Sequence, residues 1–212
     1  MGTEYKTVLD LDHLAEAALN KAVAFRLVRT KAASKASHLN SPNLGTSIDD
    51  RDRSELAPAG NQIEVLVSDG LSAEAVHANV PEILPILLEG LTKKGISCGQ
   101  PLLAPYGRVK LAEEVAECLQ AKLVVLLIGE RPGGDAHASR SLSAYLVYRI
   151  DDAQVQKEAA SFSGHRDIRF EYSVISNIYG RGIPPVEAAS LIIEKSLAIL
   201  SKRAAGNRLE SF

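Results

Sequence analysis

The sequence predicts an α/β fold, namely a three-layer sandwich with a mostly parallel sheet, preceded by a small helical and irregular N-terminal segment. Residues 122–128 form a short apolar run without a polar face, which is typical of a strand buried on both sides. From residue 61 onward, strand-like runs alternate with longer helical patterns, as in sheets covered by helices. The chain has 212 residues, which is enough for one well-filled core.

The N-terminal part of the chain differs in character from the rest. Apolar side chains recur at roughly helical spacing over residues 8–30, which predicts an amphipathic helix. Residues 31–60 are rich in Ser, Asp, Pro and Gly and predict loops with short helical turns. We therefore expect residues 1–60 to form an N-terminal helical and irregular segment and residues 61–212 to form the main domain.

The main domain shows a regular order of elements. The expected strands cover residues 62–68, 122–128, 142–150 and 168–178, and residues 101–105 are expected to form a short extended piece. The expected helices cover residues 73–94, 110–120 and 185–204. Ser72 is a good N-cap for the first helix, but Pro81 and Pro85 predict that this helix is split in two near residue 81. Gly206 is expected to close the last helix, and the polar residues 151–167 predict a hairpin or an excursion.

Composition excludes several classes of protein. Hydrophobic residues make up 46% and charged residues 24%, as in ordinary soluble domains. The net charge of −2 and the lack of a Lys/Arg run argue against nucleic-acid binding. No apolar run is long enough to span a membrane, and no secretory signal begins the chain, so we expect a cytoplasmic protein. Cys98 and Cys118 are then expected to be reduced, and the spacing of Cys and His predicts no metal site.

Polar residues follow three of the expected strands, at residues 68–70, 128–131 and 176–180. If these strands are parallel neighbours, the three groups converge at one end of the sheet and form a binding rim. For Asp69, the alternative is that it stabilises its own turn or caps a helix. For the charged pair in the second group, the alternative is a solvated loop. No phosphate-binding loop or nucleophile turn is present, so the residues predict binding of something bulky without bond chemistry.

Several motifs, in this order along the chain, resemble the small (light, beta) subunit of ethanolamine ammonia-lyase. They are Ser68-Asp69-Gly70-Leu71-Ser72-Ala73, Tyr106-Gly107-Arg108-Val109, Gly129-Glu130-Arg131-Pro132-Gly133, Ser143-Ala144-Tyr145, Ile175-Ser176-Asn177-Ile178 and Pro184-Pro185-Val186-Glu187-Ala188-Ala189. The resemblance covers about residues 61–206 and extends more weakly into residues 34–48.

The resemblance implies a subunit of an adenosylcobalamin-dependent lyase that converts ethanolamine to acetaldehyde and ammonia. In that family the large subunit, a TIM barrel, carries the radical chemistry and the substrate pocket. The small subunit, a Rossmann-like three-layer sandwich, covers the cobalamin at the interface, in a hetero-oligomer of large–small pairs. The N-terminal helix then reads as a docking helix or as a packaging peptide for a bacterial microcompartment. A protein supplies position while its cofactor carries the difficult chemistry, which agrees with the lack of catalytic groups.

By motif, the resemblance places cobalamin contacts on Val109, Glu130 and Val174. The two valines offer apolar surface for the benzimidazole or the corrin edge. The Glu130 carboxylate can accept hydrogen bonds from corrin carboxamides or ribose hydroxyls. Val174 stands where the family motif has Cys, and residues 151–169 form a longer segment than the family has there.

Two other interpretations remain open from the sequence. The chain could be a non-catalytic corrinoid- or nucleotide-binding module with a different partner. It could also be a stand-alone small-molecule transferase on a flavodoxin-like sheet, although no candidate nucleophile or base supports that interpretation.

Overall fold

The computed structural model describes residues 23–130, 140–150 and 170–211. Its centre is a six-stranded sheet in the order β1-β3-β2-β4-β5-β6. The strands are β1 (Arg26–Leu27), β2 (Ile63–Ser68), β3 (Leu102–Leu103), β4 (Leu123–Gly129), β5 (Leu142–Arg149) and β6 (Phe170–Ile178). The first four in the sheet are paired in parallel, and β5 is antiparallel to both β4 and β6. Every strand except β5 therefore runs in one direction, which agrees with the mostly parallel sheet predicted from the sequence.

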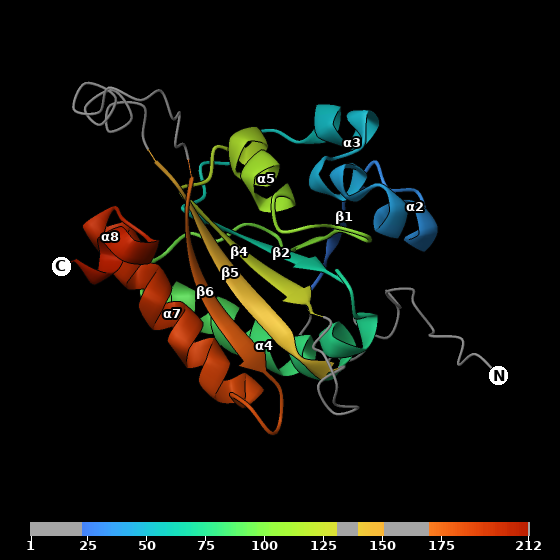
Figure 1. Cartoon of the computed structure of the whole chain (residues 1–212). Coiled ribbons are helices and arrows are strands. Elements are labelled where there is room, and N and C mark those ends of the chain that lie inside the picture. Colours follow the sequence, from blue (N-terminus) through green and yellow to red (C-terminus); the bar gives the residue numbers. More distant parts are fainter. Residues whose placement is uncertain (1–22, 131–139, 151–169, 212) are drawn as a thin grey trace.

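Helices cover both faces of this sheet. One face carries α4 (Ala73–Lys93) and α7 (Pro185–Lys202), which is followed by the short helix α8 (Gly206–Glu210). The other face carries α5 (Leu111–Leu119) and the N-terminal elements α2 (Lys35–Asn40), η1 (Pro42–Thr46) and α3 (Asp50–Glu55). In Figure 1, α5 lies in front of the sheet and α4 behind it. The three-layer α/β class is confirmed.

Strand β4 shows why an apolar run without a polar face is a central strand. Leu123, Val125 and Leu127 pack into the core on the α4 side. Their alternate neighbours pack into the core on the α5 side, and every residue of the strand is buried. A strand covered on both faces needs apolar side chains at every position, because successive residues point to opposite sides.

The predicted break in the first long helix is wrong. Helix α4 is continuous, with Pro81 and Pro85 inside it, and Ser72 caps it as expected by accepting from the Ala75 N–H at 3.2 Å. A proline within a helix removes one hydrogen bond, at a cost of about 3 kcal/mol. Here one whole side of the helix is buried against the sheet, and that packing keeps the segment helical through both prolines.

Two other helix predictions also need correction. The predicted N-terminal helix does not reach residue 30, since Arg26–Leu27 form strand β1, held to β3 by the Arg26 N–H to Pro101 oxygen bond of 2.9 Å. The earlier part of that helix lies outside the described residues. The last long helix ends at Lys202, where Arg203 adopts a left-handed φ of 52°, and Gly206 begins α8. The expected hairpin or excursion at residues 151–167 also lies outside the described residues.

Two further features bear on function. Within the described ranges, no helix is long and apolar enough to cross a membrane. Cys98 and Cys118 are both free thiols, as expected, and burial raises the pKa of Cys98 to about 12. A thiol with so high a pKa is a poor nucleophile, so Cys98 is not a candidate for covalent catalysis.

Candidate functional site

The three polar groups predicted to form a rim do lie at one end of the sheet. Strands β2 and β4 are neighbours with Ser68 opposite Ile128, and the Leu71 N–H donates to the Gly129 oxygen at 2.9 Å. The third group follows β6, which is separated from β4 by the antiparallel strand β5. The prediction that the three groups lie at one end of the sheet is therefore correct. Its premise, that the three strands are parallel neighbours, is wrong.

Glu130 and Tyr145 form the polar centre of this region on the α5 side. Glu130 follows β4 directly, and its N–H donates to the Ser141 oxygen at 3.0 Å. The Tyr145 hydroxyl on β5 donates to Glu130 Oε1 at 3.0 Å. Burial, together with the Glu130 carboxylate, raises the pKa of Tyr145 to about 12. Tyr145 is therefore a neutral phenol at neutral pH and fixes one oxygen of the carboxylate.

Val174 lies beside this pair on the next strand. It is directly opposite Tyr145 in the β5–β6 register, and residues directly opposite each other point to the same face of a sheet. Val174 is 44% exposed and is one of five large apolar side chains that are exposed among the described residues.

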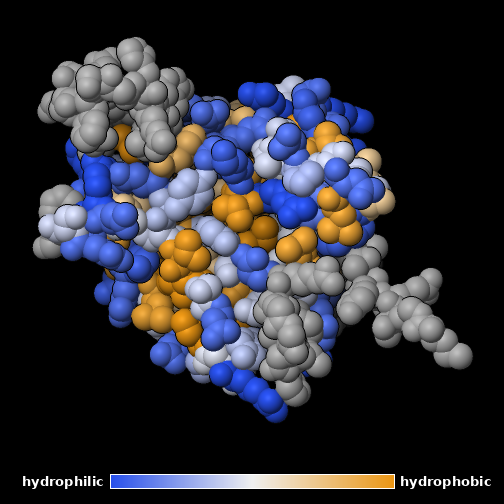
Figure 2. Space-filling view, viewed as in Figure 1, coloured by the Kyte–Doolittle hydropathy of each residue, from blue (hydrophilic) through white to orange (hydrophobic). Residues whose placement is uncertain are grey.

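Val109 precedes α5 and packs against the apolar core on the same side. The sequence-predicted positions Val109, Glu130 and Val174 therefore all lie on the α5 side of the sheet. Figure 2 shows this side of the molecule, with hydrophobic side chains at the surface between the positions of α5 and α7. An apolar surface with one carboxylate in it can bind a large, mostly apolar molecule that carries N–H or hydroxyl donors.

Sequence reasoning missed Tyr145, which connects the predicted positions. The motif Ser143-Ala144-Tyr145 points to this residue in the sequence, but it does not show which residues are its neighbours in space. Only the antiparallel register of β5 places Tyr145 next to Val174 and within reach of Glu130.

Asp69 lies at this end of the sheet, but its side chain is buried below the surface. Its side chain is 1% exposed, and its Oδ1 accepts from the Tyr106 N–H at 2.6 Å. Lys35 Nζ lies 3.7 Å from Asp69 Oδ2, which is an ion-pair distance rather than a hydrogen bond. The structure thus favours the interpretation that Asp69 holds backbone in place over a ligand role. Arg131 lies outside the described residues.

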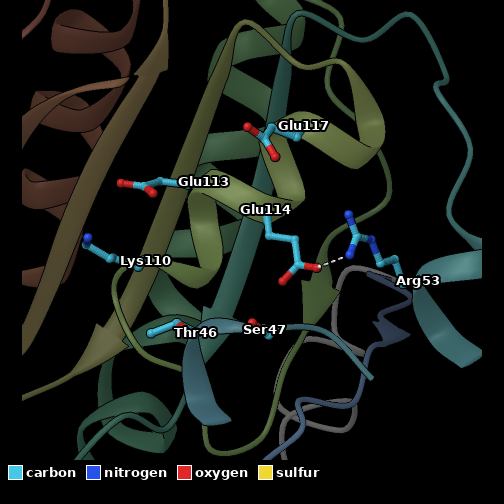
Figure 3. Close-up of a pocket in the computed structure, with 7 residues that line it drawn as sticks. All are labelled: Thr46, Ser47, Arg53, Lys110, Glu113, Glu114 and Glu117. Carbon is cyan, nitrogen blue, oxygen red and sulfur yellow. Dashed lines mark ion pairs between the residues drawn. The ribbon is translucent and has the colours of Figure 1, made fainter. Parts of the chain in front are cut away.

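A hollow of about 260 Å³ lies between α5 and the N-terminal elements (Figure 3). It is lined by Thr46, Ser47, Arg53, Lys110, Glu113, Glu114 and Glu117. Glu114 pairs with Arg53 at 3.4 Å and accepts from the Ile48 N–H at 2.8 Å, whereas Glu113 extends to the other side and accepts from the Tyr172 hydroxyl. These carboxylates fasten α5 to its neighbours. In the part of the chain that the structure describes, no cluster of His, Cys, Asp and Glu could hold a metal ion.

Comparison with known families decides what this arrangement belongs to. A family model described as ethanolamine ammonia-lyase light chain matches residues 6–210. The chain belongs to the ethanolamine ammonia-lyase light chain family. As a light chain it is a subunit of a lyase that acts in ethanolamine degradation, and it has a large subunit as its partner. The resemblance seen in the sequence motifs is confirmed.

The Tyr145–Glu130 bond gives this light chain a testable alkaline titration. A pKa raised on folding, here to about 12 from an ordinary value of 10, stabilises the fold fully below pH 10. That contribution is lost as the pH rises through about 12. We expect urea unfolding midpoints to fall over this window, and to fall less in Tyr145→Phe. An equal fall in both proteins would show that Tyr145 is not the group responsible.

Proposed function

We propose that this light chain holds adenosylcobalamin at its interface with the large subunit, through Val109, Glu130 and Val174. One observation carries the proposal, namely that Tyr145 joins two of the three positions. It hydrogen-bonds Glu130 and stands opposite Val174, so an acceptor and an exposed apolar side chain are presented on one face. That combination suits a corrinoid, which has apolar surfaces bordered by carboxamides and ribose hydroxyls.

The residues present fit this cofactor. The Tyr145 hydroxyl donates to Glu130 Oε1 at 3.0 Å, and a carboxylate has two oxygens with about four acceptor positions, so Glu130 can accept further hydrogen bonds from a ligand. Val174 and the partly exposed Val109 offer apolar area, and covering it contributes about 25 cal/mol per Å². When bound, adenosylcobalamin supplies the radical chemistry. The light chain binds and orients the cofactor and excludes water, with no catalytic residue of its own.

The proposal also assigns roles to the parts of the chain and to the assembly. Residues 61–212 form the domain that covers cobalamin, and residues 1–60 form the segment that docks, or that packages the protein. The assembly is a hetero-oligomer of large–small pairs. Its location is the cytoplasm, with a bacterial microcompartment as the alternative to a free complex.

Reconstitution tests the proposed function. The light chain and a large subunit of the family are co-expressed, adenosylcobalamin is titrated into the purified complex, and ethanolamine turnover is measured. We expect tight cofactor binding and turnover only when both subunits are present. Turnover by the light chain alone, or equal cofactor affinity of the large subunit without it, would refute the proposal.

The substitution Glu130→Gln tests the carboxylate. Gln keeps the shape but removes the charge, and hydrogen bonds to a charged acceptor are worth roughly 1.5–3 kcal/mol. We expect the dissociation constant of adenosylcobalamin for the complex to rise about tenfold. Glu187→Gln, an exposed position on α7, is the matched control and is expected to have no effect. Unchanged affinity in Glu130→Gln would remove Glu130 from the site.

A further inference from the structure

The loop that carries Val109 begins with a backbone conformation that needs support. Tyr106 has φ +60, in the left-handed region that residues other than glycine rarely adopt. Two glycines allow other chain segments to approach this loop closely. A Cβ on Gly45 would lie 2.5 Å from the Tyr106 oxygen, and a Cβ on Gly107 would lie 2.6 Å from Ser68 Oγ. The loop is therefore clamped between the N-terminal segment and β2.

Hydrogen bonds fix this loop at successive residues. The N–H groups of residues 106–108 donate in turn to Asp69 Oδ1 at 2.6 Å, Ser68 Oγ at 2.9 Å and the Gly45 oxygen at 2.8 Å. Ser68 is the last residue of β2 and Asp69 follows it, whereas the third acceptor belongs to the N-terminal segment. Because the next residue along the chain is Val109, the same bonds set where its side chain can lie.

His38 on α2 holds the loop from the other side. It is fully buried, and its ring Nδ1 lies 2.7 Å from the Tyr106 oxygen. A carbonyl oxygen only accepts, so Nδ1 must carry the proton. Burial lowers the pKa of His38, which favours the neutral ring. The Arg108 guanidinium donates to the His38 oxygen at 2.9 Å, so the contact between α2 and the loop is reciprocal.

Lys35, one turn earlier on α2, secures the acceptor of the Tyr106 N–H. Its Nζ donates to the Gly70 oxygen at 2.9 Å and forms the ion pair with Asp69. The Lys35 side chain is only 20% exposed, and burial lowers its pKa while Asp69 opposes that shift. Because the Lys35 ammonium is mostly buried, its ion pair with Asp69 holds that carboxylate where it can accept from the Tyr106 N–H.

We propose that His38 and Lys35 are positioning residues that set Val109 for contact with adenosylcobalamin, which makes helix α2 part of the cofactor site. This inference rests on the proposed function, because it requires that Val109 touches the cofactor. It assigns to residues of the N-terminal segment a role in cofactor affinity that does not depend on docking to the large subunit.

A double-mutant cycle in the complex of both subunits tests this inference. The four proteins are the natural one, His38→Leu, Val109→Ala and the double variant, and the readout is the dissociation constant of adenosylcobalamin. We expect each single variant to raise that dissociation constant about five- to tenfold. If His38 acts through Val109, the double variant is no weaker than the weaker single variant.

His38→Asn is the rescue variant. The Asn side-chain amide places an N–H donor where Nδ1 stands, so it can still donate to the Tyr106 oxygen. We expect its cofactor affinity to stay within about threefold of the natural protein. A role limited to general stability would instead lower the unfolding midpoints of both His38 variants without a difference in cofactor affinity between them.

The outcomes separate the inference from the proposed function. Fully additive effects of His38→Leu and Val109→Ala, or no effect of His38→Leu, overturn the inference alone. No effect of Val109→Ala, or no cofactor binding by the natural complex, overturns the inference and the proposed Val109 contact together. If His38→Leu gives no soluble complex, Lys35→Met replaces it in the same cycle with the same expected results.

Discussion

Val109→Asp is expected to raise the dissociation constant of adenosylcobalamin for the two-subunit complex about a hundredfold. In the proposed site Val109 is covered by the cofactor, so a carboxylate there would be taken out of water without a partner. The fold should lose only about 1 kcal/mol, because Val109 gives up its packing against the core while an acidic side chain just before α5 is favourable near the positive end of the helix. Equilibrium titration of the complex measures the affinity, and thermal unfolding of the light chain measures the fold.

Val186→Asp is the matched control for this prediction. Val186 is 54% exposed and lies in the first turn of α7, which packs on the opposite face of the sheet. The same change of residue type there should leave cofactor affinity within about twofold, since surface substitutions usually have small effects. Equal losses in the two variants would mean that the effect is not specific to the proposed site, and no loss in Val109→Asp would exclude Val109 as a contact.

The strands of this light chain could be predicted from sequence because their signal is local. The apolar composition of β4 by itself indicates that the strand is buried on both faces. The prediction of α4 was wrong at Pro81 and Pro85 because the packing that keeps this helix continuous is not local. The energy that keeps them in one helix comes from Val80, Ile83 and Leu84, which are buried against a sheet that no local window contains.

The candidate site was predictable only in part, because its contacts join residues that lie far apart in the sequence. The motifs that resemble the family supplied Val109, Glu130 and Val174 without their geometry. Tyr145 became visible only through pairing across strands. His38 is separated from Tyr106 by 68 residues, so no spacing rule could have joined them. A buried polar network depends on tertiary contacts, and each of its members looks like an ordinary surface residue in the sequence.

Asp69→Ala is expected to lower the free energy of unfolding of the light chain by about 3 kcal/mol. The substitution leaves the Lys35 ammonium mostly buried, with the Gly70 oxygen as its remaining acceptor. It also removes the acceptor of the Tyr106 N–H, although Tyr106 must hold a left-handed backbone that costs about 1–2 kcal/mol. Urea unfolding, followed by circular dichroism, measures the change.

Asp52→Ala is the control for this prediction. It also removes a buried carboxylate, but it does not leave a buried cation unpaired. Asp52 is also buried, and its side chain accepts from the Arg29 backbone at 2.6 Å and pairs with the Arg29 guanidinium. The Arg29 side chain is 57% exposed, however, so water can solvate it once Asp52 is gone. We therefore expect a clearly smaller loss of stability than at Asp69. Equal losses at the two positions would show that the low exposure of Lys35 does not set the strength of the Asp69 network.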